Sequence, residues 1–431
     1  MSDKRKSMKN AAKNVLLVLL VLLMGLLCAA NWLTGMSLAQ VPADSMLRRL
    51  YDRAVGGAVG YELRASGVAA ASPAQLALTV DGQLCGIQYS LTEVDAGMEA
   101  VRAAWGQALD GGALREADEQ ELTAALGGAA CMLLRYHGAI PLGVLSGWMG
   151  GNWDSSLPVS TLVYAAEAGT LFIRLADGTL YAAPASIEES ALAQAQQNFH
   201  GTACKFSGGA YAVYPETLLF EAEALSLPLL RAEAPALFAP QSGAGLETLL
   251  AAFGYTPYTR AYSEQGDRAR VYVDGVSTLR VNASGLVQYA ASGEDGTVRA
   301  YEQGEADGQR ALDAQIDCAR QILDSALTAA ETDTHASLYA VQQAGSRTTV
   351  AFMQTYGGVP ILGESDFATF VFEDGMLSSA AIQLQCFRAE QTRRMVMPAR
   401  QAAAGAQGEA RGLIAAYRLQ EDLFVPSRFY F

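Results

Sequence analysis

The residue types that most often carry catalysis are few and widely separated in this sequence of 431 residues. Its three histidines, His137, His200 and His335, stand singly, without the H-E-x-x-H or H-x-x-x-H spacing of a zinc site. The stretch GVLSG has the wrong spacing for a nucleophile elbow, and Lys205 lacks a serine three residues before it. Two carboxylates at the separation needed to hydrolyse a glycan remain an alternative among the 44 acidic residues. The sequence favours a protein that is not an enzyme and predicts no metal and no cofactor.

An uncharged apolar run, NVLLVLLVLLMGLLCAANWL, stands near the N-terminus at residues 14–33. A helix of that length spans about 30 Å, which is the thickness of a bilayer's hydrocarbon core. Residues 1–13 carry five basic side chains against one acidic side chain, so the positive-inside rule keeps them in the cytoplasm. We expect a single-pass signal anchor at residues 14–36, with the bulk of the chain outside the cell membrane. A secretory signal cleaved after Ala39 is the alternative.

Small side chains on this apolar segment indicate a contact with another helix. Gly25 and Ala29 are four residues apart and share a helix face, and Asn31 lies at the edge of that face. Small residues let a second helix approach closely, and an amide can donate a hydrogen bond across the interface. The segment is therefore predicted to dock against transmembrane helices of a partner, and an ordinary leucine-rich anchor is the alternative.

Composition limits the classes of partner. Beyond residue 13, 25 lysines and arginines stand against 43 aspartates and glutamates, which gives a net charge of -18 and excludes nucleic acid. With 51% hydrophobic residues the chain can build folded cores, and its length suits two or three domains. The five cysteines beyond the apolar run have no C-x-x-C spacing. They are predicted to be small buried side chains, with one disulfide as the alternative.

The exported part alternates helical and strand patterns. Residues 271–290, VYVDGVSTLRVNASGLVQYA, hold three short alternating runs separated by two turn signals, which is typical of an antiparallel meander. Residues 312–327 place apolar side chains on one face at helical spacing. Alternation buries one face of each sheet beneath a helix. We predict an α+β fold of antiparallel meander sheets with packed helices, in two to three extracytoplasmic domains: an N-terminal unit at 37–165, a central unit at 166–300 and a C-terminal unit at 301–431.

Two short stretches are candidate partner-binding sites. GWMGGNWD, residues 147–154, holds Trp148 and Trp153 among glycines, and tryptophan is favoured at the centre of protein interfaces. The alternative is a connection whose indoles fold back onto the sheet. Tyr356 and Pro360 delimit YGGVP, which either faces a partner or is only a strand-ending turn.

Several of these motifs resemble a known family. The apolar segment preceded by KN and followed by NW is similar to the start of YycH, a single-pass regulator in Gram-positive bacteria. AFGYTPYTRAYSEQGDRARVYVDGVSTLRVNASGLVQYA resembles a part of YycH in which a short helix, a Y-x-D-G turn and a meander occur together. FMQTYGGVPILGESDFATFVFEDGMLSSAAIQ resembles the C-terminal pattern of its partner YycI and, more distantly, of PepSY-type domains.

The resemblance implies a function in signalling. It implies an extracytoplasmic protein without enzymatic activity that acts with a YycI-like protein on a sensor histidine kinase of a two-component system controlling the cell wall. The contact is expected to involve both the transmembrane helices and the outer domains. The alternative is a PepSY-type binding module that inhibits a secreted protease or holds a ligand.

Overall fold

The computed structural model describes most of the chain beyond residue 71. The expected cytoplasmic tail at 1–13 and membrane segment at 14–36, with Gly25, Ala29 and Asn31, lie outside the described residues. In the part that is described, no helix is both long and apolar enough to cross a membrane. The described ranges are 59–60, 72–128, 130–221, 225–237, 243–264, 269–292, 296–301, 308–363 and 366–431.

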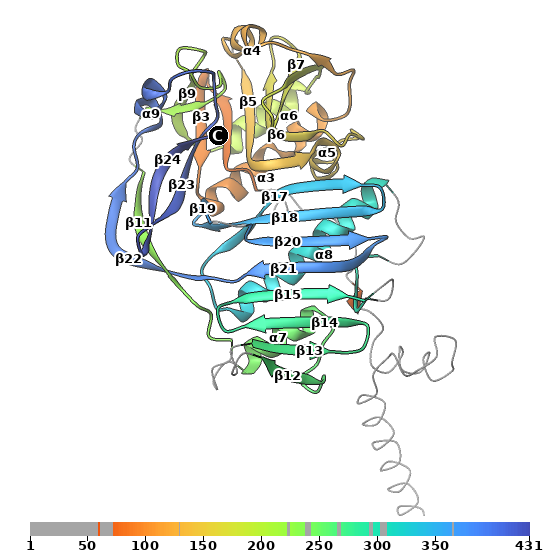
Figure 1. Cartoon of the computed structure of the whole chain (residues 1–431). Coiled ribbons are helices and arrows are strands. Elements are labelled where there is room, and N and C mark those ends of the chain that lie inside the picture. The colour runs from red at the N-terminus through yellow and green to blue at the C-terminus, as the bar shows by residue number, and fades with distance from the viewer. Residues whose placement is uncertain are drawn as a thin grey trace, which may run out of the picture.

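The fold combines helices with mainly antiparallel sheets, as the sequence predicts. The first part of the described chain forms an upper lobe (Figure 1). The sheet of this lobe is antiparallel, in the order β9–β3–β2–β5–β6–β7–β8–β4, and β10 pairs with β9. Its strands are β2 (Gln75–Val80), β3 (Gln83–Gln88), β4 (Arg115–Glu116), β5 (Cys131–Pro141), β6 (Pro158–Ala165), β7 (Thr170–Leu175), β8 (Leu180–Pro184), β9 (Thr202–Phe206) and β10 (Leu218–Phe220).

Helices cover both faces of the upper sheet. Helices α3 (Leu91–Ala108), α5 (Leu142–Met149) and α6 (Glu189–Asn198) pack on one face, where Trp105 and Leu134 share a core. On the opposite face, Leu122 of α4 (Glu119–Leu126) packs against Leu133 and Val163. Because successive residues of a strand point to opposite faces, the mostly apolar run CMLLRYH serves both cores.

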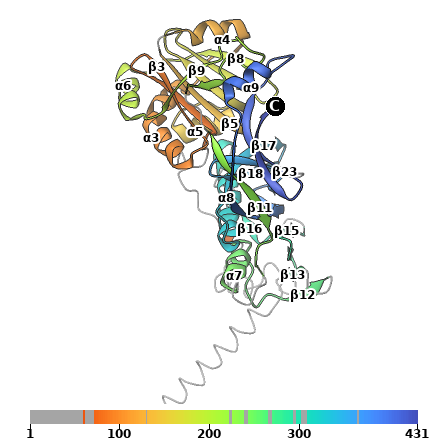
Figure 2. The same ribbon diagram turned by 90° about the vertical axis from the view of Figure 1, so that its left-hand side faces the viewer.

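A central antiparallel sheet lies below the upper lobe, in the order β12–β13–β14–β15–β21–β20–β18–β17 (Figure 1). Helices α7 (Gly243–Ala252) and α8 (Gly308–Ala329) lie on one side of it (Figure 2). The strands are β12 (Ala261–Glu264), β13 (Ala269–Val273), β14 (Ser277–Asn282), β15 (Leu286–Ala291), β17 (His335–Ala344), β18 (Arg347–Tyr356), β20 (Ala368–Glu373) and β21 (Met376–Gln383), and the short β1 (Val59–Gly60) and β16 (Val298–Arg299) pair beside them.

The meander predicted at residues 271–290 is confirmed as β13, β14 and β15. Its turns contain Gly275 and Gly285 at φ 95° and 90°, a backbone conformation that glycine adopts without strain. Burial alternates along β14, so one face lies in the core while the other is partly open to solvent. The helix expected at residues 312–327 is confirmed within α8, whose apolar face packs on the central sheet.

A smaller side sheet completes the fold, in the order β22–β11–β24–β23–β19. Its elements are β11 (Ser226–Glu233), β19 (Val359–Leu362), β22 (Cys386–Met395), β23 (Leu413–Gln420), β24 (Leu423–Tyr430) and the nearby helix α9 (Ala399–Gly405). Tyr89, at the end of β3, accepts a hydrogen bond at its hydroxyl from the backbone N–H of Ala415, with a separation of 2.8 Å. The side sheet therefore contacts the upper lobe through residues that lie far apart in the sequence.

Strand pairing crosses both boundaries expected from the sequence. The boundary at 165/166 falls between β6 and β7, which pair along their lengths. The boundary at 300/301 separates β15 from β21 and β11 from β22, and both of these pairs are hydrogen-bonded. The three sheets therefore do not coincide with the three expected units. This difference arises because the paired strands are distant in sequence, and local sequence patterns do not indicate which distant strands will pair.

Candidate functional site: two sets of arginines

The two tryptophans proposed as partner-binding residues lie in the core of the upper lobe. Trp148 belongs to α5 and is 2% exposed, and Trp153 follows that helix and is 8% exposed. The Ser146 hydroxyl accepts a hydrogen bond from the Trp153 N–H at 2.8 Å and donates one to the Leu109 carbonyl at 2.9 Å. These bonds fold the segment back onto the end of α3, so neither indole is presented at the surface.

The YGGVP turn is an internal joint between the side sheet and the upper lobe. The ring of Tyr356 lies edge-on to that of Tyr417, with 6.3 Å between their centroids, and Pro360 is buried in β19. A β-carbon at Gly358 would lie 2.9 Å from the carbonyl carbon of Tyr89. Pro360 therefore packs inside the protein, Tyr356 is partly buried against the side sheet, and Gly358 of the turn lies against the chain's own backbone.

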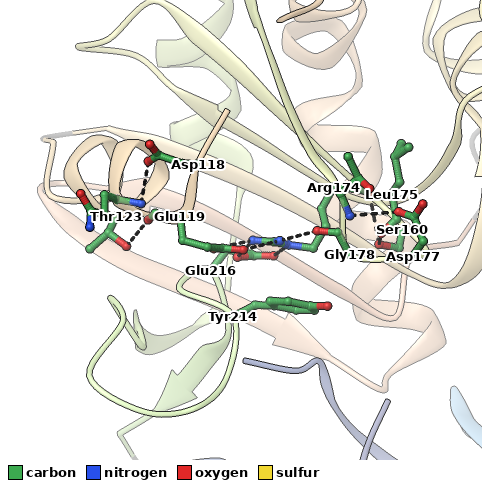
Figure 3. A network of polar contacts seen from close by, with 12 residues as sticks. Asp118, Glu119, Thr123, Ser160, Arg174, Leu175, Asp177, Gly178, Tyr214 and Glu216 are labelled. Carbon is green, nitrogen blue, oxygen red and sulfur yellow. Dashed lines mark hydrogen bonds and ion pairs between the residues drawn. The ribbon is translucent and has the colours of Figure 1, made fainter. Parts of the chain in front are cut away.

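An ion-pair network centred on Arg174 lies between β7 and the segment that covers it (Figure 3). Its guanidinium donates two hydrogen bonds to Glu216, at 2.5 and 2.9 Å, and two to Glu119, at 2.7 and 3.0 Å. A fifth, at 3.1 Å, goes to the carbonyl of Gly178, and the ring of Tyr214 lies 4.0 Å from the guanidinium carbon. Arginine has five N–H donors, so this side chain keeps none for a ligand.

Electrostatics keep Arg174 charged inside the protein. Arg174 is 2% exposed and Glu216 is 1% exposed. Burial by itself lowers the pKa of Arg174, but Glu216 and then Glu119 outweigh it and raise that pKa above its ordinary value. The network is therefore a structural element that fixes residues 207–217 on the upper sheet.

Arg174 ends a row of polar residues that crosses the upper sheet. In this row Arg135 donates from Nε to the Thr161 hydroxyl at 3.4 Å, and its Nη2 lies 3.9 Å from a carboxylate oxygen of Glu216. Neither Nη atom has a hydrogen-bond partner among the described residues, and burial lowers the pKa of Arg135. The row comprises Gln88 of β3, Gln75 of β2, Arg135 of β5, Thr161 of β6 and Arg174 of β7.

The sequence carries one signal of this network. TLFIRL and CMLLRYH each place a single arginine within a run of apolar strand residues. A charge in such a run is buried with the strand and must find a partner there. The partners themselves, Glu119 and Glu216, lie in segments whose sequences look like ordinary solvated surface.

A cleft of 640 Å³ is lined by residues of both the upper lobe and the central sheet, which also contact each other directly where β5 pairs with β17. Arg320 of α8 and His335 of β17 line one side, and Ser90, Thr92 and Asp95 at the start of α3 line the other. The cation and the helix N-terminus favour an anion, whereas Asp95 opposes one. Among its described lining residues no hydroxyl is hydrogen-bonded to His335, and the Ser72 hydroxyl donates to Asp95 at 3.1 Å.

The histidines and cysteines do not gather into a site. His137 is in β5, where burial lowers its pKa to about 4, while His200 follows α6 and His335 begins β17. Within the described ranges no cluster of histidine, cysteine, aspartate and glutamate is suited to a metal ion. The cysteines that the structure describes are all unpaired; Cys131, Cys204 and Cys318 are buried as predicted, whereas Cys85 and Cys386 are half-buried.

The most exposed part of the side sheet is a two-stranded ribbon formed by β11 and β22, hereafter the ribbon (Figure 1). Phe387 is the only buried residue of β22, so most of that strand is open to solvent on both faces. Among the described strands β22 pairs with β11 alone, which leaves its other edge open. Cross-strand ion pairs join Arg231 to Glu390 at 2.8 Å and Arg388 to Glu233 at 3.8 Å.

The fold and these sites define a mixed α and β protein with a buried structural arginine network and an exposed, arginine-bearing ribbon. No family model matches the chain, and no match is found among the curated proteins or the solved structures. The resemblance to YycH therefore stays a prediction.

Proposed function

We propose that the chain is a non-enzymatic, membrane-anchored extracytoplasmic regulator of the YycH type. In this proposal it binds a sensor histidine kinase, together with a YycI-like protein, and biases the signalling state of the kinase. The observation that supports binding to a protein partner is the ribbon, whose outer strand β22 has an open edge and is mostly exposed.

The ribbon has the features of an interaction surface. Natural proteins cover long open strands or keep them short, because unpaired N–H and C=O groups attract other strands. The strand β22 has ten residues and a free edge among the described strands. It ends in Arg393, Arg394 and Met395, and arginine and methionine are both enriched in protein interfaces. A partner strand or loop would cover this edge.

The membrane segment supplies the second contact in the proposal. Gly25 and Ala29 would pack against a transmembrane helix of the kinase, with Asn31 at the margin. An interhelical polar contact contributes only about 0.6 kcal/mol on average, so the ribbon and the helix must act together. Two linked contacts raise the effective concentration of each for its partner.

Site-specific photocrosslinking tests this function in membranes. A photoreactive residue at Gln391 of the ribbon is expected to capture the sensor kinase, whereas the same residue at exposed Arg260, beside β12, is expected not to. The kinase should also co-purify with the unaltered chain and less with the Gly25→Ile, Ala29→Ile double variant. A kinase that neither crosslinks at Gln391 nor co-purifies with the unaltered chain would contradict the proposal.

A further inference from the structure

A groove of 570 Å³ lies where the ribbon ends, between β22, α9 and β24. Its floor is apolar, since Val396 and Ala402 are each 2% exposed. Its walls include methionine and tyrosine side chains that are open to solvent: Met395 is 67%, Met397 50% and Tyr430 41% exposed.

Hydrogen bonds hold the frame of the groove. The Arg428 guanidinium donates to the Met397 carbonyl at 3.1 Å, and the Tyr430 hydroxyl donates to the Ala402 carbonyl at 2.6 Å. The strand β24 and the segment leading into α9 are therefore fixed relative to each other. The two methionine side chains remain adaptable, because an unbranched thioether chain changes rotamer at little cost.

The charge of this region is opposite to that of the protein. Residues 386–431 contain seven arginines and four acidic residues, whereas the whole chain has a net charge of -14. Arg394 and Arg428 line the groove, and no aspartate or glutamate is among its described lining residues. Arg394 is exposed and has no ion pair or side-chain hydrogen bond with any described residue. Since an arginine does not lose its proton at physiological pH, the groove keeps its positive charge.

We infer that this groove binds a segment of a partner protein that carries carboxylates next to large apolar side chains. An apolar side chain would enter between Met395 and Met397 and rest on Val396, and a carboxylate beside it would pair with Arg394. Charge complementarity selects this occupant, because a basic groove attracts carboxylates and repels segments like itself. The inference rests on the proposed function and names the chemistry of the partner segment.

A hollow suits side chains of a peptide better than it suits a membrane. A surface that enters a bilayer projects its apolar residues, whereas here Val396 and Ala402 form the floor of a recess. Anionic lipid and a second copy of the chain are therefore treated as competing outcomes in the test.

The test measures fluorescence anisotropy of a short labelled peptide that alternates glutamate and phenylalanine. The protein is the full chain in phosphatidylcholine nanodiscs. We expect saturable binding that weakens about tenfold in Arg394→Glu, because an attraction is replaced by a repulsion. Met397→Ser should weaken binding by a smaller factor, and Arg260→Glu, with the same change of charge far from the groove, should bind like the unaltered chain.

Three outcomes would contradict the inference about the groove. In the first, Arg394→Glu binds the peptide as tightly as the unaltered chain does; in the second, a peptide with lysine in place of glutamate binds as tightly as the original peptide. In the third, the chain binds phosphatidylglycerol vesicles in a way that depends on Arg394 but does not bind the peptide. A dimer that Arg394→Glu dissociates, seen by sedimentation, would assign the groove to a second copy instead. Failure of the unaltered chain to co-purify with the kinase would overturn only the proposed function, because the peptide assay does not involve the kinase.

Discussion

Arg174 and Arg394 are the same residue type in opposite surroundings. All five donors of Arg174 are bound to protein oxygens inside the upper lobe, whereas Arg394 is exposed at the end of the ribbon and pairs with no described residue. A buried charge must be compensated inside the protein, so its loss damages the fold. A solvated charge contributes little to the fold and is available to a partner. Burial and partners, not residue type, therefore separate the structural arginine from the binding arginine.

The largest expected effect comes from breaking the buried network. Arg174→Met leaves the carboxylate of Glu216, which is 1% exposed, without its main partner. We expect the free energy of unfolding of the upper lobe to fall by about 3–5 kcal/mol. Tryptophan fluorescence during urea unfolding measures it, because Trp105, Trp148 and Trp153 all lie in that lobe's core.

A double variant is the control for this prediction. Arg174→Met combined with Glu216→Leu removes both charges of this pair and should recover part of the lost stability. Recovery should stay incomplete, because buried Arg135 loses a carboxylate that lies 3.9 Å away. A single variant as stable as the unaltered chain would show that the network does not hold the lobe.

The next largest effect is expected at the turn where the side sheet meets the upper lobe. Gly358→Ala places a β-carbon 2.9 Å from the Tyr89 carbonyl carbon at a φ of 82°, so we expect a loss of about 2–4 kcal/mol. Gly357→Ala has a φ of 56° but nothing within 4 Å, so it should lose only about 1 kcal/mol. Urea unfolding compares them, and equal losses would mean that the turn does not press on the upper lobe.

A pH-dependent effect is expected at Asp313 of α8. Burial raises its pKa to about 6, and the hydrogen bond from Gln309, which lowers that pKa, only partly offsets the rise. The unfolded chain has an ordinary aspartate pKa of about 3.9, so the folded state holds the proton more tightly. The stability contribution of this group is therefore full below pH ~4, falls as the pH rises to about 6, and stays low above it.

The Asp313→Asn variant removes this dependence. At pH 7 it should be more stable than the unaltered chain by about 1–3 kcal/mol, and the two should converge at pH ~4. Urea unfolding at a series of pH values is the measurement. An advantage that grows as the pH falls would have the wrong sign for a carboxyl with a raised pKa.

The smallest effect belongs to the exposed arginines. Arg394→Ala should change the free energy of unfolding by less than about 0.5 kcal/mol, since Arg394 lacks a described partner. Arg388→Ala should change it by less than about 1 kcal/mol, since Arg388 makes a solvated ion pair. A loss comparable with that of Arg174→Met would remove the distinction between the two regions.

Local features of the fold were predictable from the sequence. The β2–β3 hairpin turns at Asp81 and Gly82, both with positive φ, which is the backbone conformation that a D-G pair favours. The meander at 271–290 and the helix within 312–327 follow from spacing alone. Each depends on residues a few positions apart, and that is the range over which backbone periodicity and turn chemistry act.

The candidate sites were decided by distant contacts. Trp148 and Trp153 in a glycine-rich stretch resemble an exposed binding loop, but the fold places α5 over a core that absorbs both indoles. Likewise, YGGVP is a turn in any context, and only the approach of Tyr89, far earlier in the chain, makes it a joint. The sequence specifies which side chains are apolar, whereas tertiary packing decides which of them remain open to a partner.

By itself the sequence determined the class of fold, the turns, the main amphipathic helix and the prediction of an apolar anchor at 14–36. The tertiary structure alone decided where the sheets divide and what each arginine does. Glu119 and Glu216 reach Arg174 from 55 and 42 residues away, and Arg394 has no such neighbour among the described residues. The physical reason is that desolvation and pairing energies depend on neighbours in space, while sequence patterns record only neighbours along the chain.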